Sequence, residues 1–284
     1  MRKISNILQN NNITVSFLRV FALLSVLLSH TLVTSGIYDY SVFDYAKSLF
    51  LLLSGMLYAN KVIDNKRDFI KKRILKILLP MWIFSLFISI MEYVATNQGT
   101  TSLLSFFIIL INFQGINSIF FKWNYFATHI IFSTSSYWFI TVITICYIIL
   151  VLIKNTSIDN LIKNNRMVFI FIMLFVQVIF AIFFSIQIGY IFAFFIGYVF
   201  YDIDKIDLRK TILFFVFVLL FGLLRLMLRN TMDNTVFYNE VIIPLFNASA
   251  ASFIAVLCYY LQNKYKVLNV LNENRIFRFL ERNS

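Results

Sequence analysis

The feature that most constrains this chain is a succession of apolar runs, most of them long enough to cross a bilayer. They cover residues 13–35, 42–60, 74–95, 137–153, 168–185, 190–201, 211–228 and 241–261. Only 13% of the 284 residues are charged, whereas a soluble protein uses about a quarter. Backbone polar groups in lipid are satisfied in helices or closed barrels, and continuous runs favour helices. The sequence therefore predicts an all-α integral membrane protein, a polytopic helical bundle.

The net charge of +12 indicates membrane topology rather than a nucleic-acid partner, because the basic residues gather between the runs. Basic loops mark the cytoplasmic side of a membrane protein. With these stretches inside, the runs make about eight spans with both ends cytoplasmic, and residues 96–136 form an outer-face re-entrant or interfacial segment. We expect a multi-pass protein of the cell membrane. The basic stretches are residues 61–76, 154–166, 205–210 and 264–282.

The first run, FLRVFALLSVLLSH, carries Arg19 and His30. Eleven residues make about three helical turns, so both side chains leave nearly one face, about 16 Å apart along the axis. Intramembrane charges avoid lipid, so this face is expected to turn into the bundle. Taken singly, Arg19 also fits a snorkelling arginine at the interface, and His30 fits a hydrogen bond between helices.

Four elements in order resemble one family. FLRVFALLSVLLSH resembles the R-x10-H signature of the acyltransferase 3 family, bacterial integral membrane enzymes that O-acylate cell-surface glycans. SLFLLLSGMLY, KKRILKILLPMW (with the proline at the start of the third span) and SYWFITVITICY resemble its later elements. The chain departs from the pattern at Arg73-x-x-Lys76, where the family has a second arginine. It also ends at FRFLERNS, a segment that in the family usually precedes another helix pair, for about ten spans in all. The resemblance implies one membrane acyltransferase domain over residues 1–284, truncated at its C-terminus.

The resemblance implies an O-acyltransferase of the lipid bilayer, and O-acetyl transfer is its simplest form. The donor would be cytosolic acyl-CoA, such as acetyl-CoA, and the acceptor a hydroxyl of a cell-surface polysaccharide or lipid-linked glycan. We expect acyl-CoA as a substrate, no permanently bound cofactor and no metal. A transporter or flippase of a glycan intermediate would use the same polar face without a base, and a sensory or scaffold protein is a third reading. Acetyl transfer from labelled acetyl-CoA would separate them.

The phosphates of the donor need cations at the inner mouth, where Arg19, Arg73 and Lys76 are expected. Positive-inside anchoring accounts equally for Arg73 and Lys76. Ser54 and Gly55 lie in the inner half of the second run. A glycine there admits either a ligand or a closely packed helix, and the sequence leaves both open.

His30 is the best candidate for a general base, because imidazole titrates near neutral pH. Asp44, near the outer end of the second run, would orient it, or would instead pair with Lys47. Glu92 is a weaker alternative. Aromatic faces suit sugar rings but also form interfacial belts. The weak candidates for acceptor binding are Trp123, His129, Trp138 and Glu240.

Overall fold

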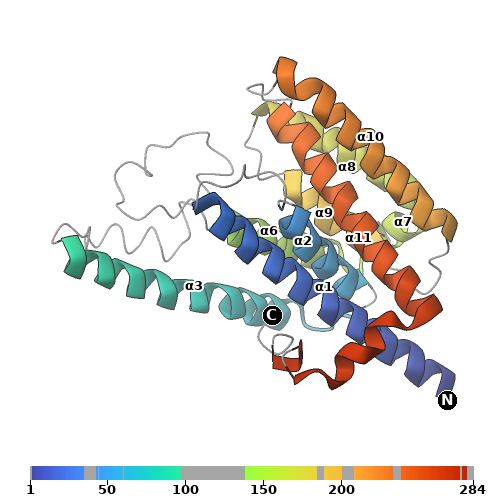
Figure 1. Cartoon of the computed structure of the whole chain (residues 1–284), viewed down its shortest axis with the longest axis horizontal. Coiled ribbons are helices and arrows are strands. Elements are labelled where there is room, and N and C mark those ends of the chain that lie inside the picture. The colour runs from blue at the N-terminus through green and yellow to red at the C-terminus, as the bar shows by residue number, and fades with distance from the viewer. Residues whose placement is uncertain are drawn as a thin grey trace. The chain divides into compact units, whose positions relative to one another are not determined.

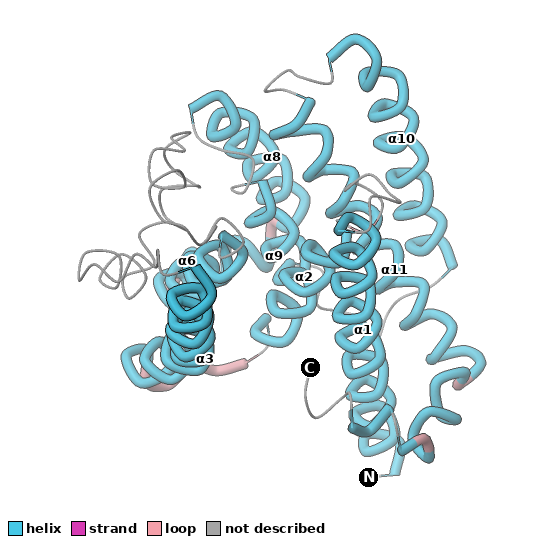
Figure 2. Tube along the Cα trace, turned by 60° about the vertical axis from the view of Figure 1, so that its left-hand side comes forward, coloured by secondary structure: helices cyan, strands magenta, loops and turns pink. Residues whose placement is uncertain are grey.

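The computed structural model describes residues 2–34, 43, 45–59, 61–96, 138–183, 189–199, 208–232, 238–275 and 277–279. This part of the chain is helical, without strands (Figure 2). Each of the eight predicted apolar runs contains a helix, so the prediction of an all-α membrane bundle is confirmed. The helices are α1 (Arg2–Thr34), α2 (Tyr45–Ala59), α3 (Lys66–Thr96), α6 (Trp138–Ile153), α7 (Ser157–Asn164), α8 (Arg166–Phe183), α9 (Gly189–Val199), α10 (Leu208–Met232), π-helix η4 (Tyr238–Ile242), α11 (Ile243–Tyr265) and 3-10 helix η5 (Val267–Glu273).

Two helical segments of the described chain are long and apolar enough to cross a membrane, Thr211–Arg229 and Ile243–Tyr265. A third crossing arises if α6 and α7, which are bent by 103° at their junction, count as one span. Other apolar helical segments are shorter than a full crossing, and the number of about eight spans stays a prediction. These segments are Ile13–Ser29, Tyr45–Ala59, Val168–Ile179 and Tyr190–Val199.

The chain divides into two compact units, Met1–Lys61 with Phe192–Ser284 (unit 1) and Val62–Ile191 (unit 2). In unit 1, α10 and α11 run side by side (Figure 1). Phe246 of α11 lies against Gly222 of α10, where an added Cβ would come 3.3 Å from its ring, and the Arg225 guanidinium lies 5.0 Å from the ring centre. A small residue thus lets an aromatic ring of one helix settle against the backbone of the other.

Helix α2 packs on both α11 and α1 in unit 1. Tyr45, the first residue of α2, stacks on Phe21 of α1 with ring centres 6.3 Å apart. Its hydroxyl forms a hydrogen bond of 3.3 Å with the Ser25 hydroxyl. The start of α2 is therefore fixed on the face of α1 that also buries Leu18 and Ala22.

In unit 2, α3 begins earlier than predicted, and the expected basic loop 61–76 is wrong over most of its length. Asn65 caps the helix, because its side-chain oxygen accepts the Asp68 backbone N–H at 3.1 Å and its amide donates to the Asp68 carboxylate at 2.8 Å. Lysine and arginine are good helix formers, so the basic stretch becomes the first turns of α3. Pro80 accordingly lies inside α3 rather than at its start.

The predicted basic loop 154–166 is also largely helical, since it contains α7. This short helix is amphipathic and buries Asp159 and Ile162. Residues 96–136, predicted as an outer-face segment, lie outside the described part of the chain except for Thr96 at the end of α3.

Candidate functional site

Arg19 and His30 lie on one uninterrupted helix, α1, as predicted. The Arg19 side chain is half-buried, next to the buried Leu18 and Val20. Within the described part of the chain, no acidic side chain pairs with the Arg19 guanidinium and no hydrogen bond joins it. The side chain of His30, and Asp44 altogether, lie outside the described residues. The structure thus offers a cation on an apolar helix whose charge no described protein group matches.

Gly55 of α2 lies where the backbone of α9 crosses. An added Cβ on Gly55 would overlap the carbonyl oxygen of Phe194 and approach the Tyr198 backbone nitrogen to 2.9 Å. At the same crossing, a Cβ on Gly197 would overlap the carbonyl oxygen of Leu52. Close helix packing, one of the two readings of Gly55, therefore has a partner in the structure, while its part in acyl-CoA binding stays a prediction.

Ser54, beside this crossing, is half-buried. It places a hydroxyl next to the glycine. Its assignment to acyl-CoA binding stays a prediction.

Arg73 and Lys76 are i,i+3 neighbours on α3 in unit 2. The Arg73 guanidinium lies 5.7 Å from the centre of the Phe69 ring, and Phe69 meets the Tyr147 ring of α6 edge-on at 6.3 Å. Arg73 is half-buried and Lys76 is exposed. An aromatic contact restrains the long Arg73 side chain, which lowers the conformational entropy that binding of an anion would cost it. Arg19 belongs to unit 1, so the predicted cations come from both units.

The residues predicted for the acceptor side are not described in enough detail to form a site. Trp123 and His129 lie outside the described residues. Trp138 begins α6 and Glu240 lies in η4, but their side chains are not described. The same holds for the side chain of Glu92 on α3. Their roles stay predictions.

A buried charged cluster that was not predicted from the sequence lies at the turn between α6 and α7. The Asp159 carboxylate accepts from Lys163 at 3.1 Å and lies 3.8 Å from the Lys154 ammonium. The side chains of Lys154 and Asp159 are only 3% and 4% exposed. Burial lowers the pKa of Lys154 to about 8, and the nearby Asp159 charge opposes this shift. The i,i+4 spacing of Asp159 and Lys163 could have indicated an ion pair on one helix. The burial of Lys154 could not be predicted in this way, because it depends on the bend between α6 and α7.

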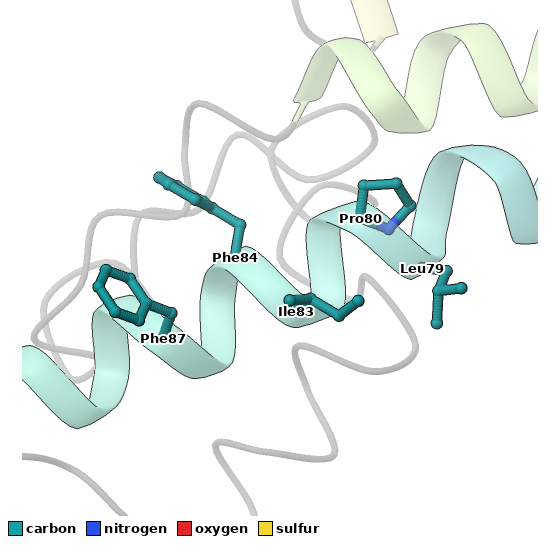
Figure 3. Close-up of a pocket in the computed structure, with 5 residues that line it drawn as sticks. All are labelled: Leu79, Pro80, Ile83, Phe84 and Phe87. Atoms are coloured by element: carbon teal, nitrogen blue, oxygen red, sulfur yellow. The ribbon is translucent and has the colours of Figure 1, made fainter.

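A hollow on α3 is lined by apolar side chains alone, Leu79, Pro80, Ile83, Phe84 and Phe87 (Figure 3). It has no group that could bind phosphate or take a proton. Among the described residues, no grouping of histidine, cysteine and carboxylate side chains could hold a metal ion.

The fold defines a helical, multi-pass membrane protein. Residues 12–284 match the model of a family described as an acyltransferase domain. The chain therefore belongs to this acyltransferase family, and it is a membrane acyltransferase. No curated protein and no solved structure matches it.

Proposed function

We propose that this chain is an O-acyltransferase that moves an acyl group, most simply acetyl, from cytosolic acyl-CoA to a hydroxyl of a cell-surface polysaccharide or lipid-linked glycan. The observation that carries the proposal is α1, which holds Arg19 and His30 on one continuous helix and leaves the Arg19 charge without a described protein partner. Such a cation in an apolar helix is costly unless something binds it. Membership of the acyltransferase family supplies the reaction class.

Arg19, Arg73 and Lys76 serve the donor. Guanidinium groups hold phosphate oxygens with paired, charge-assisted hydrogen bonds, and a lysine adds a point charge. The phosphates of CoA are then held at the cytoplasmic end of the helices. The long pantetheine arm carries the thioester along α1 toward His30, over about 16 Å of helix axis.

His30 is the general base. Its imidazole accepts the proton of the acceptor hydroxyl while the hydroxyl oxygen attacks the thioester carbonyl carbon. The carbon–sulfur bond of the tetrahedral intermediate then breaks and leaves an ester on the sugar. The CoA sulfur departs with the proton that the imidazolium returns, so His30 ends in its starting form. In this proposal Asp44 orients the imidazole.

Membranes containing the full-length protein test the proposal when they receive labelled acetyl-CoA and the label in glycan is counted. His30→Ala should lower transfer about 10²- to 10⁴-fold, the usual scale for a lost general base. His30→Gln should be nearly as inactive, because an amide cannot take a proton near neutral pH. Thr31→Ala, a control at the neighbouring exposed residue, should retain activity.

If His30→Gln retained most activity, the general base would have to be Asp44, Glu92, Glu240 or His129. If unaltered membranes failed to transfer label to any glycan, the proposed acetyl-CoA donor or the glycan acceptor would be wrong.

A further inference from the structure

The turn that joins α6 to α7 reaches across unit 2 to the start of α3. Asn155 takes a left-handed backbone conformation, with φ of 59°, which asparagine tolerates better than most residues. Its side-chain amide donates a 3.0 Å hydrogen bond to the carbonyl oxygen of Ile63, 92 residues earlier. Ile63 is buried and lies three residues before α3 begins. The Asn155 side chain thus connects the turn between α6 and α7 to the residues just before α3.

The buried Asp159 holds Asn155 in this place. Its carboxylate accepts the Asn155 backbone N–H at 3.2 Å, and its other oxygen accepts from Lys163 at 3.1 Å. Lys154, the residue before Asn155, is buried with its ammonium 3.8 Å from the same carboxylate. A carboxylate buried among several donors has little freedom to move. The geometry of Asn155 is therefore determined by charge as well as by its backbone.

Beyond Ile63, a short path of contacts leads to the cations of α3. Asn65 caps the helix, and one turn later Phe69 packs edge-on against Tyr147 of α6. The Arg73 guanidinium lies 5.7 Å from the centre of the same Phe69 ring. The Asn155 hydrogen bond thus fixes the residue three positions ahead of α3, and the Phe69–Tyr147 contact fixes its first turn on α6.

We propose that Asn155, held by Asp159, is a positioning residue that sets the first turns of α3 so that Arg73 and Lys76 meet the phosphates of acyl-CoA. The inference rests on the proposed function. Phosphate recognition by a guanidinium depends on direction as well as distance. Loss of the Asn155 bond should therefore weaken donor binding. It should leave the chemical step nearly unchanged, since the proposed base, His30, lies on α1.

Asn155→Gly tests this directly, because glycine accepts a positive φ without strain and only the side-chain bond is lost. Asn155→Asp, which tolerates the same backbone but cannot donate, is the second variant. Both should raise KM for acetyl-CoA about three- to tenfold with kcat and membrane protein level nearly unchanged. Direct binding of acetyl-CoA to the purified full chain should weaken by the same factor.

Asn165→Ala is the matched control. The Asn165 amide donates to the Leu161 carbonyl within α7 and makes no link to α3, so KM for acetyl-CoA should not change. Unchanged KM and binding in Asn155→Gly would overturn the positioning role, as would a loss of kcat or protein level with KM unaltered. If the unaltered protein bound acetyl-CoA but transferred nothing, the proposed function would fail, while the binding comparison would still decide the role of Asn155.

Discussion

Lys154 in unit 2 and Arg19 in unit 1 show two ways in which an apolar protein keeps a cation. Lys154 is buried at the end of α6, and the Asp159 carboxylate lies beside it. Arg19 is half-buried within α1, and no described carboxylate pairs with it. A buried charge is stable only when it is matched, by the protein or by something that binds. Lys154 is thus matched by a protein group, whereas the proposed function assigns the Arg19 charge to a bound donor.

Two helix crossings within unit 1 also differ in how closely the backbones meet, and Gly55→Ala should have the largest effect on stability. At the α2–α9 crossing in unit 1, backbone meets backbone, so a new methyl group overlaps the Phe194 carbonyl. The free energy of unfolding should fall by about 3 kcal/mol, or the protein should fail to accumulate. Thermal unfolding of the detergent-purified protein measures this.

Gly222→Ala is the control for Gly55→Ala, because the added methyl group there meets only the movable ring of Phe246, at 3.3 Å. Its cost should be small, since alanine also favours the helix by about 1 kcal/mol over glycine. Equal losses at Gly55 and Gly222 would contradict the backbone crossing.

Asp159→Asn should have the next largest effect, because it leaves Lys154 and Lys163 without the anion between them. Removing one partner of a fully buried pair costs about 3 kcal/mol, and the loss here should be somewhat smaller because the Lys163 side chain is 27% exposed. Asp68→Asn makes the same chemical change on an exposed residue of α3 and should cost less than about 1 kcal/mol. Comparable unfolding temperatures for the two variants would show that the Asp159 cluster contributes little.

Lys154→Met tests the role of the buried Lys154 charge through the pH dependence of the free energy of unfolding. Burial lowers the pKa of Lys154 to about 8 from an ordinary value of 10.5. Above pH 8 the unfolded chain therefore binds more protons at this group than the folded chain, and stability from this group rises with pH until about 10.5. Below pH 8 the free-energy penalty for burying the charged Lys154 side chain is fully present. Lys154→Met should remove this rise and leave the protein at least as stable at pH 7, since the penalty is gone and Asp159 keeps Lys163. Unfolding curves of both proteins from pH 7 to 10 decide the point, and parallel pH profiles would contradict it.

The sequence predicted the helices well but missed what happens at their ends. Long apolar runs leave the backbone no other structure in lipid, so α1, α2 and the later helices could be foreseen. The start of α3 was misplaced because the span was begun at the first apolar residues, whereas the Asn65 cap begins the helix among basic residues that also favour a helix.

The candidate site was predictable only where it lies on one helix. Arg19 and His30 share a face of α1 through helical spacing alone. Asn155 and Ile63, or Gly55 and Gly197, meet only after distant segments pack, and no local pattern encodes such a contact.

The binding of acetyl-CoA to purified Arg19→Gln tests the central claim most directly. This change should have the smallest effect on stability, within about 1 kcal/mol, because no described protein partner of Arg19 is lost. Affinity for acetyl-CoA should nevertheless fall about tenfold to a hundredfold, the scale of a lost hydrogen bond to a charged group. Unchanged affinity together with a lower unfolding temperature would show that the Arg19 charge, like that of Lys154, is matched within the protein.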